Sequence, residues 1–209
     1  MANIVTGRVG EPHITSDDDR ARHIEQFGKG KFVFNVGKRF DAVINNGAHT
    51  ITISDGMLMS CGTQMGIEPL NTETVSIENG VSGYKRYDLI VMQYTRDTVQ
   101  DVESAELVVK KGAPVVSNPV DPVYTTGDIM AGATLDETPI WRVVLDGNAI
   151  TGVEAMISKK DGKKNTSYQE DPEGTGGEVD PTVPSMVITD ATIDKLWGMA
   201  LPDGDAGRY

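Results

Sequence analysis

Apolar residues along the chain follow two spacings, a helical one before residue 31 and an alternating one after it. In the first region an apolar residue recurs every three positions and would line one face of a helix: Ala21, Ile24 and Phe27. Ser16 precedes them as a candidate N-cap, and the three aspartates 17–19 place negative charge at the positive end of the helix dipole. Gly28 is typical of the position just beyond a helix end. The pattern predicts a short helix over residues 17–27.

The three aspartates allow a second interpretation, as ligands of a calcium ion. They lack the alternating spacing and the distal glutamate of a calcium-binding loop. Helix capping is therefore the favoured interpretation of residues 17–19.

From Lys31 onward, apolar and polar residues alternate in short runs that end at turn-forming pairs rich in Gly and Asn. We expect tight turns at four places: Asn45–Gly47, Asp55–Gly56, Asn79–Gly80 and Asp146–Asn148. This rhythm continues to Ile157 and is typical of antiparallel strands rather than βαβ units. The sequence therefore predicts a mainly β fold, with an antiparallel β-sandwich or barrel-like domain over residues 31–157.

Two strand pairs stand out within this domain. Residues 87–94 are a run of strand formers that would pair with residues 105–112 across a polar connection. Residues 140–145 would pair with residues 150–157 as a hairpin. Between the two pairs, prolines mark an excursion that cannot be a central strand, because proline has no N–H to donate: Pro114, Pro119 and Pro122.

The composition changes after Ser158 to lysines and then to glycine, proline and acidic residues, which predicts a solvated linker. Beyond it, residues 190–197 would form a short helix with one apolar face: Ile193, Leu196 and Trp197. Such a short helix is unstable alone in water, so we expect an extended C-terminal arm whose helix docks on another protein surface. Four segments result: 1–30 with the first helix, the β domain 31–157, the linker 158–184 and the docking segment 185–209.

The net charge limits the classes of molecule that this chain is expected to bind. The 209 residues include 19 Lys and Arg against 31 Asp and Glu, so the formal charge is 19 − 31 = −12. Nucleic acids and anionic membranes are bound by cationic surfaces, so neither is an expected partner. No apolar run reaches the roughly 20 residues that a bilayer crossing needs. The start of the chain lacks the apolar core of a signal peptide, so we expect synthesis and folding in a cytosol.

The residues that usually carry catalysis or bind metal are sparse. The three histidines, His13, His23 and His49, have no metal-pair spacing, and Cys61 is expected to be a buried thiol in an apolar strand. Asp88 is expected to accept hydrogen bonds from backbone amides, and Trp141 to pack in the core. We therefore expect no catalytic residue, no metal site and no cofactor.

Four stretches of the β domain, taken in order, resemble a phage tail module. In that module an Arg-x-Asp-x-(Ile/Val)-Val strand is followed by a Leu-x-Val-x-x-Gly-x-Pro strand, a proline-rich piece and a final strand that begins with proline. The corresponding stretches here are Arg86–Val91, Leu107–Pro114, Ser117–Pro122 and Pro139–Leu145. The opening residues, Val5–Gly7 and Glu11–Ser16, also look like the start of such proteins. The resemblance covers about residues 3–157 and is to baseplate and tail-fibre attachment proteins of phages and prophages of Gram-positive hosts.

The resemblance implies a virion structural protein without enzymatic activity, made in the bacterial cytoplasm. Its expected partners are other tail or baseplate proteins and further copies of itself. The sequence departs from receptor-binding members of the family, because only a linker and a short helix follow residue 157. A tail-tip or baseplate adaptor is therefore the expected role, and direct binding to a host receptor is not indicated.

Two alternatives stay open. The chain is a receptor- or glycan-binding tail protein if its strand tyrosines line an exposed groove: Tyr84, Tyr87, Tyr94 and Tyr124. It is a head-fibre or capsid decoration protein if the β domain is attached to a phage head instead of a tail.

Overall fold

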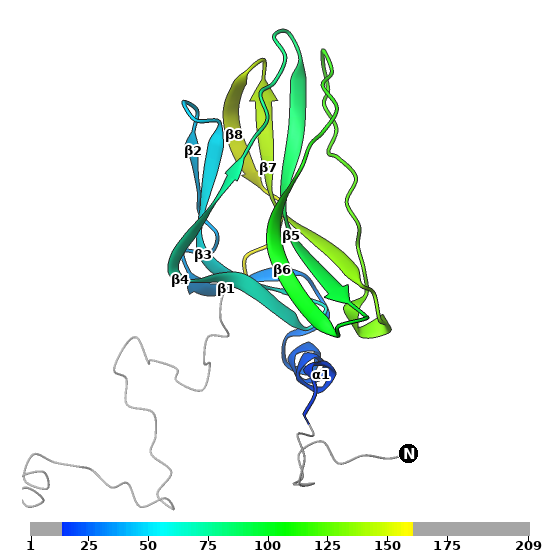
Figure 1. Ribbon diagram of the computed structural model, residues 1–209. Coiled ribbons are helices and arrows are strands. Elements are labelled where there is room, and N and C mark those ends of the chain that lie inside the picture. The colour runs from blue at the N-terminus through cyan, green and yellow to red at the C-terminus, as the bar shows by residue number, and fades with distance from the viewer. Residues whose placement is uncertain (1–13, 161–209) are drawn as a thin grey trace, which may run out of the picture. The chain divides into compact units, whose positions relative to one another are not determined.

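The computed structural model describes residues 14–160, and within this range the chain is mainly β, as predicted (Figure 1). One helix, α1, precedes eight strands that form two antiparallel sheets of four strands each. The elements are α1 (Ser16–Phe27), β1 (Phe32–Gly37), β2 (Ala42–Asn45), β3 (Thr50–Ser60), β4 (Thr63–Ser76), β5 (Lys85–Asp97), β6 (Val102–Lys110), the short 3-10 helix η1 (Ile129–Ala131), β7 (Leu135–Asp146) and β8 (Ala149–Ala155).

The long strand β3 organises the first sheet. One of its edges pairs with β4, and the other pairs with β1 at one end and β2 at the other. The second sheet has the order β6-β5-β7-β8. Both predicted strand pairs are confirmed here, since Tyr94 pairs with Ala105 and Val143 pairs with Val153.

The core lies between the two sheets. Alternate residues of β3 and β5 point into it, including Ile51 and Ile53 from β3 and Ile90 and Met92 from β5. Burying an aliphatic side chain of this size contributes about 1.5–3 kcal/mol, so this core is the main source of stability. Leu89 and Val91 alternate with these residues and are also buried, on the face of the sheet that residues 118–121 contact.

Two of the four predicted turns are confirmed. β2 ends at Asn45 and β3 begins at Thr50, and Ala48 N–H donates to Asn45 O over 3.3 Å. β7 ends at Asp146, and Gly147 takes a φ of 59° in the turn that leads to β8.

The predicted turn at Asp55–Gly56 is wrong, because both residues lie inside β3 at a bulge between Ser54 and Gly56. The buried Asp55 carboxylate accepts the backbone N–H groups of Lys38 and Leu70, each over 3.3 Å. An aspartate carboxylate can accept backbone N–H groups in a bulge as well as in a turn. The residue type alone therefore does not tell a bulge from a turn.

The reversal occurs instead at Cys61–Gly62, where Ser60 pairs with Thr63 across a two-residue loop. The φ angles of Cys61 and Gly62 are 49° and 84°, the left-handed values that such hairpins require. Cys61 is buried as expected, but in this turn rather than in a strand.

The turn predicted at Asn79–Gly80 is also misplaced. These residues lie in the connection from β4 to β5, which passes from one sheet to the other, and the turn itself falls at Ser82–Gly83. Gly80 lies so close to Gly147 that a Cβ there would overlap the Gly147 carbonyl oxygen. A glycine at position 80 therefore allows close packing against the β7–β8 turn and does not form a turn of its own.

Helix α1 begins one residue earlier than predicted, and Thr15 is its N-cap instead of Ser16. Thr15 Oγ1 accepts Asp18 N–H over 3.2 Å, and the Asp18 carboxylate accepts Thr15 N–H over 2.9 Å, which completes a capping box. The capping role of the aspartates is therefore confirmed at Asp18. The expected apolar face is only partly correct, since Ile24 and Phe27 are half-buried while Ala21 is exposed.

The proline-rich residues 111–128 form no strand, as predicted. A further proline, Pro139, lies within β7 at a bulge, where Ile90 pairs with Trp141 and Val91 pairs with Pro139. Pairing of β7 with β8 reaches only as far as Trp141, so the missing N–H of Pro139 interrupts no bond to β8. Residues 158–160 run beside β1, and the rest of the predicted linker and docking segment lies outside the described residues.

Candidate functional site

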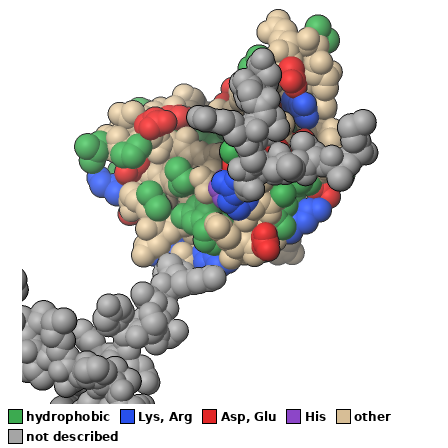
Figure 2. Space-filling view, turned by 90° about the horizontal axis from the view of Figure 1, so that it is seen from below, with side chains coloured by type: hydrophobic (Ala, Val, Ile, Leu, Met, Phe, Trp, Pro, Cys, Tyr) green, Lys and Arg blue, Asp and Glu red, His purple; other side chains and the backbone are tan. Residues whose placement is uncertain are grey.

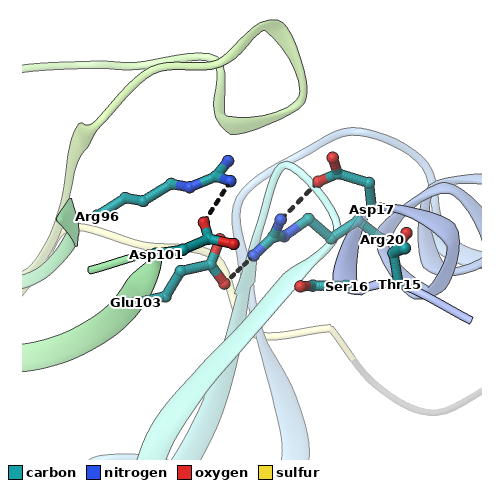
Figure 3. A pocket seen from close by; sticks show the side chains of 7 residues that line it. All are labelled: Thr15, Ser16, Asp17, Arg20, Arg96, Asp101 and Glu103. Atoms are coloured by element: carbon teal, nitrogen blue, oxygen red, sulfur yellow. Dashed lines mark hydrogen bonds and ion pairs between the residues drawn. The ribbon is translucent and has the colours of Figure 1, made fainter. Parts of the chain in front are cut away.

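A polar pocket of about 320 Å³ lies between the N-terminal end of α1 and the β5–β6 hairpin (Figure 3). Its lining combines two arginines with three carboxylates: Thr15, Ser16, Asp17, Arg20, Arg96, Asp101 and Glu103. Figure 2 views the end of the molecule that carries α1, and acidic, basic and hydrophobic side chains are interspersed on its visible described surface. The visible described surface at this end has no single dominant charge.

Arg20 is the centre of this cluster. Among the residues of α1, all of which the structure describes, only Arg20 is buried. Its Nε donates to Thr63 Oγ1 on β4 over 2.8 Å. Its Nη1 donates to Asp17 over 2.7 Å, and its Nη2 to Glu103 on β6. A single guanidinium therefore joins α1 to both sheets.

Tyr94 lies beneath this guanidinium, with its ring centroid 6.0 Å from the Arg20 Cζ. Its hydroxyl donates to Glu103 over 2.8 Å. Burial, followed by this hydrogen bond and the charge of Glu103, raises the pKa of Tyr94 to about 12. Burial alone would lower the pKa of Arg20, but its hydrogen bonds to Asp17 and Glu103 outweigh that effect and raise it. At neutral pH, Tyr94 is therefore a hydrogen-bond donor and not a base.

Arg96 and Asp101 form the outer rim of the pocket. Arg96 Nη2 donates to Asp101 over 2.8 Å, and this bond raises the pKa of Arg96. The Asp101 side chain is largely exposed, so the pair is worth little to stability. This ion pair lies at one side of the turn between β5 and β6.

Helix α1 also contacts the Cys61–Gly62 turn. His23 Nδ1 lies 2.9 Å from Gly62 O, and a Cβ at Gly62 would overlap the Arg20 carbonyl. Nε, Nη1 and Nη2 of Arg20 each have a hydrogen-bond partner, and Tyr94 keeps its proton. The cluster is therefore a set of paired polar groups that binds α1 to both sheets. Its effect is to fix the orientation of α1 on the β domain.

A second buried cluster contains the residues of the Arg-x-Asp motif. Arg86 and Asp88 point to the same side of β5 and pair through two hydrogen bonds, both 2.8 Å. The Asp88 carboxylate also accepts the N–H of Gly112 over 2.9 Å, so its predicted bond to a backbone amide is confirmed. Arg86 donates in addition to Asn79 O and Glu78 O. We call this group, Arg86, Asp88 and Gly112, the motif cluster.

The glycine of the motif cluster, Gly112, lies where there is no room for a side chain. A Cβ on Gly112 would overlap the carbonyl oxygen of Tyr87. The backbone of Gly112 can therefore approach β5 closely enough to bind Asp88 only because it has no side chain. Arg-x-Asp on β5 and the glycine that follows the end of β6 thus describe a single three-part contact.

A third cluster was missed in the sequence, because the strand was expected to start at Ile140 and starts at Leu135. Asp136 and Glu137 are fully buried and point to opposite faces of β7. Asp136 accepts from Lys31 Nζ over 2.6 Å and from Ser60 Oγ over 2.7 Å. Glu137 accepts Thr125 N–H over 2.6 Å. The two carboxylates do not face each other, so they are not an acid–base pair.

The remaining residues singled out in the sequence are dispersed. Trp141 is half-buried against the core, and its Nε1 donates to Phe40 O over 2.8 Å. His49 lies in the turn before β3. The C-terminal interface residues predicted from the sequence lie outside the described residues, as does one histidine: Ile193, Leu196, Trp197 and His13.

Two further findings concern the described residues. Residues 14–160 contain no group of three or more His, Cys, Asp or Glu side chains placed to hold a metal ion. Over the same range, no helix is long and apolar enough to cross a membrane. Compared with known proteins, the chain matches no family model and no curated protein sequence.

Proposed function

We propose that this chain is a non-enzymatic structural subunit of a phage particle, an adaptor of the tail tip or baseplate. It assembles with copies of itself and with neighbouring tail proteins. The observation that carries the proposal is the motif cluster, in which Arg86, Asp88 and Gly112 form one buried contact.

The motif cluster supports a structural role because of what its residues contact. The motif that resembles the phage module consists of residues whose side chains or backbone are bound to one another inside the protein. A motif of a catalytic family would instead present its polar groups to a substrate. The motif cluster of this chain instead joins β5 to the segment after β6 and to the loop before β5. In this chain the motif therefore encodes part of the framework of the β domain.

The polar pocket under α1 is consistent with the same role. Its charged groups are paired with one another, and together they hold α1 against both sheets. A helix fixed in this way is part of the framework of the β domain.

The glycan-binding alternative is not favoured by the positions of the tyrosines. Tyr94 is buried, and Tyr87 stacks under the guanidinium of Arg142 with 5.0 Å between Cζ and ring centroid. Tyr84 lies beside the β7–β8 turn, where its carbonyl accepts Gly147 N–H, whereas Tyr124 lines a pocket with Lys31 and Thr138. The four rings do not share a groove.

The test is to locate the protein in particles. Antibody fragments raised against residues 31–157 would be bound to purified phage particles from the encoding strain and imaged by electron microscopy. Labelling at the tail tip or baseplate is the expected result. Labelling on the head would support the capsid decoration alternative, and absence of the protein from purified particles by mass spectrometry would reject a virion role.

A further inference from the structure

The dipeptide Asn-Gly occurs twice in the chain, at Asn46–Gly47 and at Asn79–Gly80. Asparagine is chemically labile, and a following glycine increases the lability, because its unhindered backbone nitrogen can reach the asparagine side-chain amide. The two dipeptides are identical, so a difference in their chemistry has to come from the flanking residues or from the fold. The structure places them in different surroundings.

The first dipeptide lies in the exposed turn between β2 and β3, where residues 45–48 are all exposed. A Cβ on Gly47 would have only Asn45 Oδ1 near it, at an ordinary contact distance of 3.6 Å. The bonds that close the turn are donated by Ala48 N–H to Asn45, and among the described residues no hydrogen bond uses the N–H of Gly47. The backbone at position 47 therefore has room to rotate toward the Asn46 side chain.

The second dipeptide is held on both sides. Asn79 O accepts from Arg86 Nη1 over 3.3 Å, and Glu78 O accepts from Arg86 Nη2 over 2.7 Å. Gly80 is half-buried, and a Cβ there would overlap the carbonyl oxygen of Gly147. Ring closure between Asn79 and Gly80 would have to move this backbone away from Arg86 and from the β7–β8 turn. The fold therefore opposes here the movement that it permits in the first dipeptide.

We propose that Asn46 is a site of spontaneous deamidation in the folded protein and that Asn79 is protected from the same reaction. The backbone nitrogen of Gly47 attacks Cγ of Asn46, and the new N–Cγ bond closes a five-membered succinimide ring. The side-chain nitrogen of Asn46 leaves as ammonia, with the proton that Gly47 N–H gives up. Water then opens the ring at one of its two carbonyls and leaves aspartate or isoaspartate at position 46.

Asn46 also links the two sheets, which gives the modification a structural consequence. The β2–β3 hairpin and β8 lie side by side (Figure 1), and Asn46 Oδ1 accepts the N–H of Ile150 over 3.1 Å. Aspartate keeps an acceptor oxygen at this place, so that product preserves the bond. Isoaspartate moves one carbon from the side chain into the main chain, so its carboxylate no longer reaches the same position. Formation of isoaspartate should therefore break the link between the hairpin and β8.

The test measures ammonia loss at both asparagines of the full-length chain during incubation in mildly alkaline buffer, by peptide mass spectrometry. In the folded protein Asn46 should convert at least about tenfold faster than Asn79, since misplacement of reacting groups by about 1 Å can slow a reaction about 100-fold. The same chain unfolded in guanidinium chloride is the matched control. Both dipeptides are then released from the fold, and their rates should agree within about threefold.

Gly47→Ala tests the route of the reaction. Gly47 does not have a positive φ, and a Cβ fits at this position, so alanine should be accommodated without strain. The added methyl group hinders attack by the backbone nitrogen of residue 47, so ammonia loss at Asn46 should fall about tenfold or more. Thermal melting verifies that the variant folds like the wild type.

Hydrogen exchange at Ile150 tests the consequence. Its N–H should lose protection in chains that carry isoaspartate at position 46, and it should stay protected in the variant Asn46→Asp, which reproduces the other product. Equal protection in both would show that the link to β8 does not depend on this side chain.

The proposal is overturned if Asn79 converts as fast as Asn46 in the folded chain, or if Asn46 stays intact while the unfolded chain converts. An undiminished rate in Gly47→Ala would exclude ring closure by the Gly47 nitrogen. Rates that differ in guanidinium chloride as much as in the folded chain would assign the difference to the flanking residues instead of the fold. None of these results depends on where the protein is located in a particle, so the proposed function is tested separately.

Discussion

Arg86 and Asp88, two residues apart on β5, form a buried ion pair whose side chains are 3% and 1% exposed. Two hydrogen bonds join them, and each partner also binds backbone from another part of the chain. The pair thus joins β5 to residues 78–79, which shortly precede it, and to Gly112, which follows the end of β6. Its consequence for stability is directly measurable.

Asp88→Asn should destabilise the protein by about 3–5 kcal/mol, because it leaves the Arg86 charge buried without its partner. Urea unfolding followed by circular dichroism measures this change. Asp101→Asn is the matched control, since it breaks an ion pair with Arg96 that is largely exposed, and it should cost less than about 1 kcal/mol. Equal effects of the two substitutions would contradict the assigned role of the motif cluster.

Gly112→Ala should destabilise the protein by more than about 1 kcal/mol, because the added Cβ would overlap the Tyr87 carbonyl and push Gly112 N–H away from Asp88. Gly152→Ala on β8 is the control. It has open space around the position of its Cβ and should change stability by less than about 0.5 kcal/mol. The same unfolding experiment compares them, and tolerance of alanine at 112 would mean that the close approach is not required.

Arg20→Ala should release α1 from the β domain, because this one side chain carries the bonds to Thr63 and Glu103. Hydrogen exchange of residues 16–27 should then be faster, while exchange in β5 is unchanged. Arg22→Ala serves as the control, because Arg22 is half exposed and pairs only across 3.3 Å with Asp19 on the same helix. Unaltered protection of α1 in Arg20→Ala would show that other contacts hold the helix.

Tyr94 should make stability depend on alkaline pH. Its pKa is about 12 in the folded protein against about 10 when unfolded, so the proton is bound more tightly in the folded state. The resulting stabilisation is complete below pH 10 and is lost as the pH rises through 12. Unfolding of the wild type and Tyr94→Phe between pH 9 and pH 12 measures it. A similar decline in both proteins would assign the dependence to other groups.

Deletion of residues 185–209 should leave the β domain folded and reduce incorporation into particles. The reason is the predicted apolar face of Ile193, Leu196 and Trp197, which would contribute on the order of 5 kcal/mol if buried on another protein. Melting temperature and the amount of protein in purified particles are the two measurements. Incorporation of the shortened chain at the normal level would mean that this segment is not an anchor.

Local physical chemistry is the reason why several elements could be predicted from the sequence. Residues 87–94 are a continuous run of strand formers, and the hairpin around Asp146–Asn148 joins residues that are close along the chain. The α1 helix was predicted from its spacing and acidic first turn, although its cap is Thr15 and its buried residue is Arg20. Pattern and turn chemistry thus determined the fold class and two of the strand pairs.

Tertiary structure decided what the polar residues do. Asp55 looked like a turn residue, but its carboxylate binds backbone that only the fold brings near, and the tight turn formed at Cys61–Gly62 instead. Arg20 meets Glu103, and Lys31 meets Asp136, across long stretches of chain. Water solvates a charged side chain wherever the chain leaves it exposed, so its position in the sequence does not say whether it will be buried. Burial of the charge depends on whether the folded chain places an opposite charge beside it.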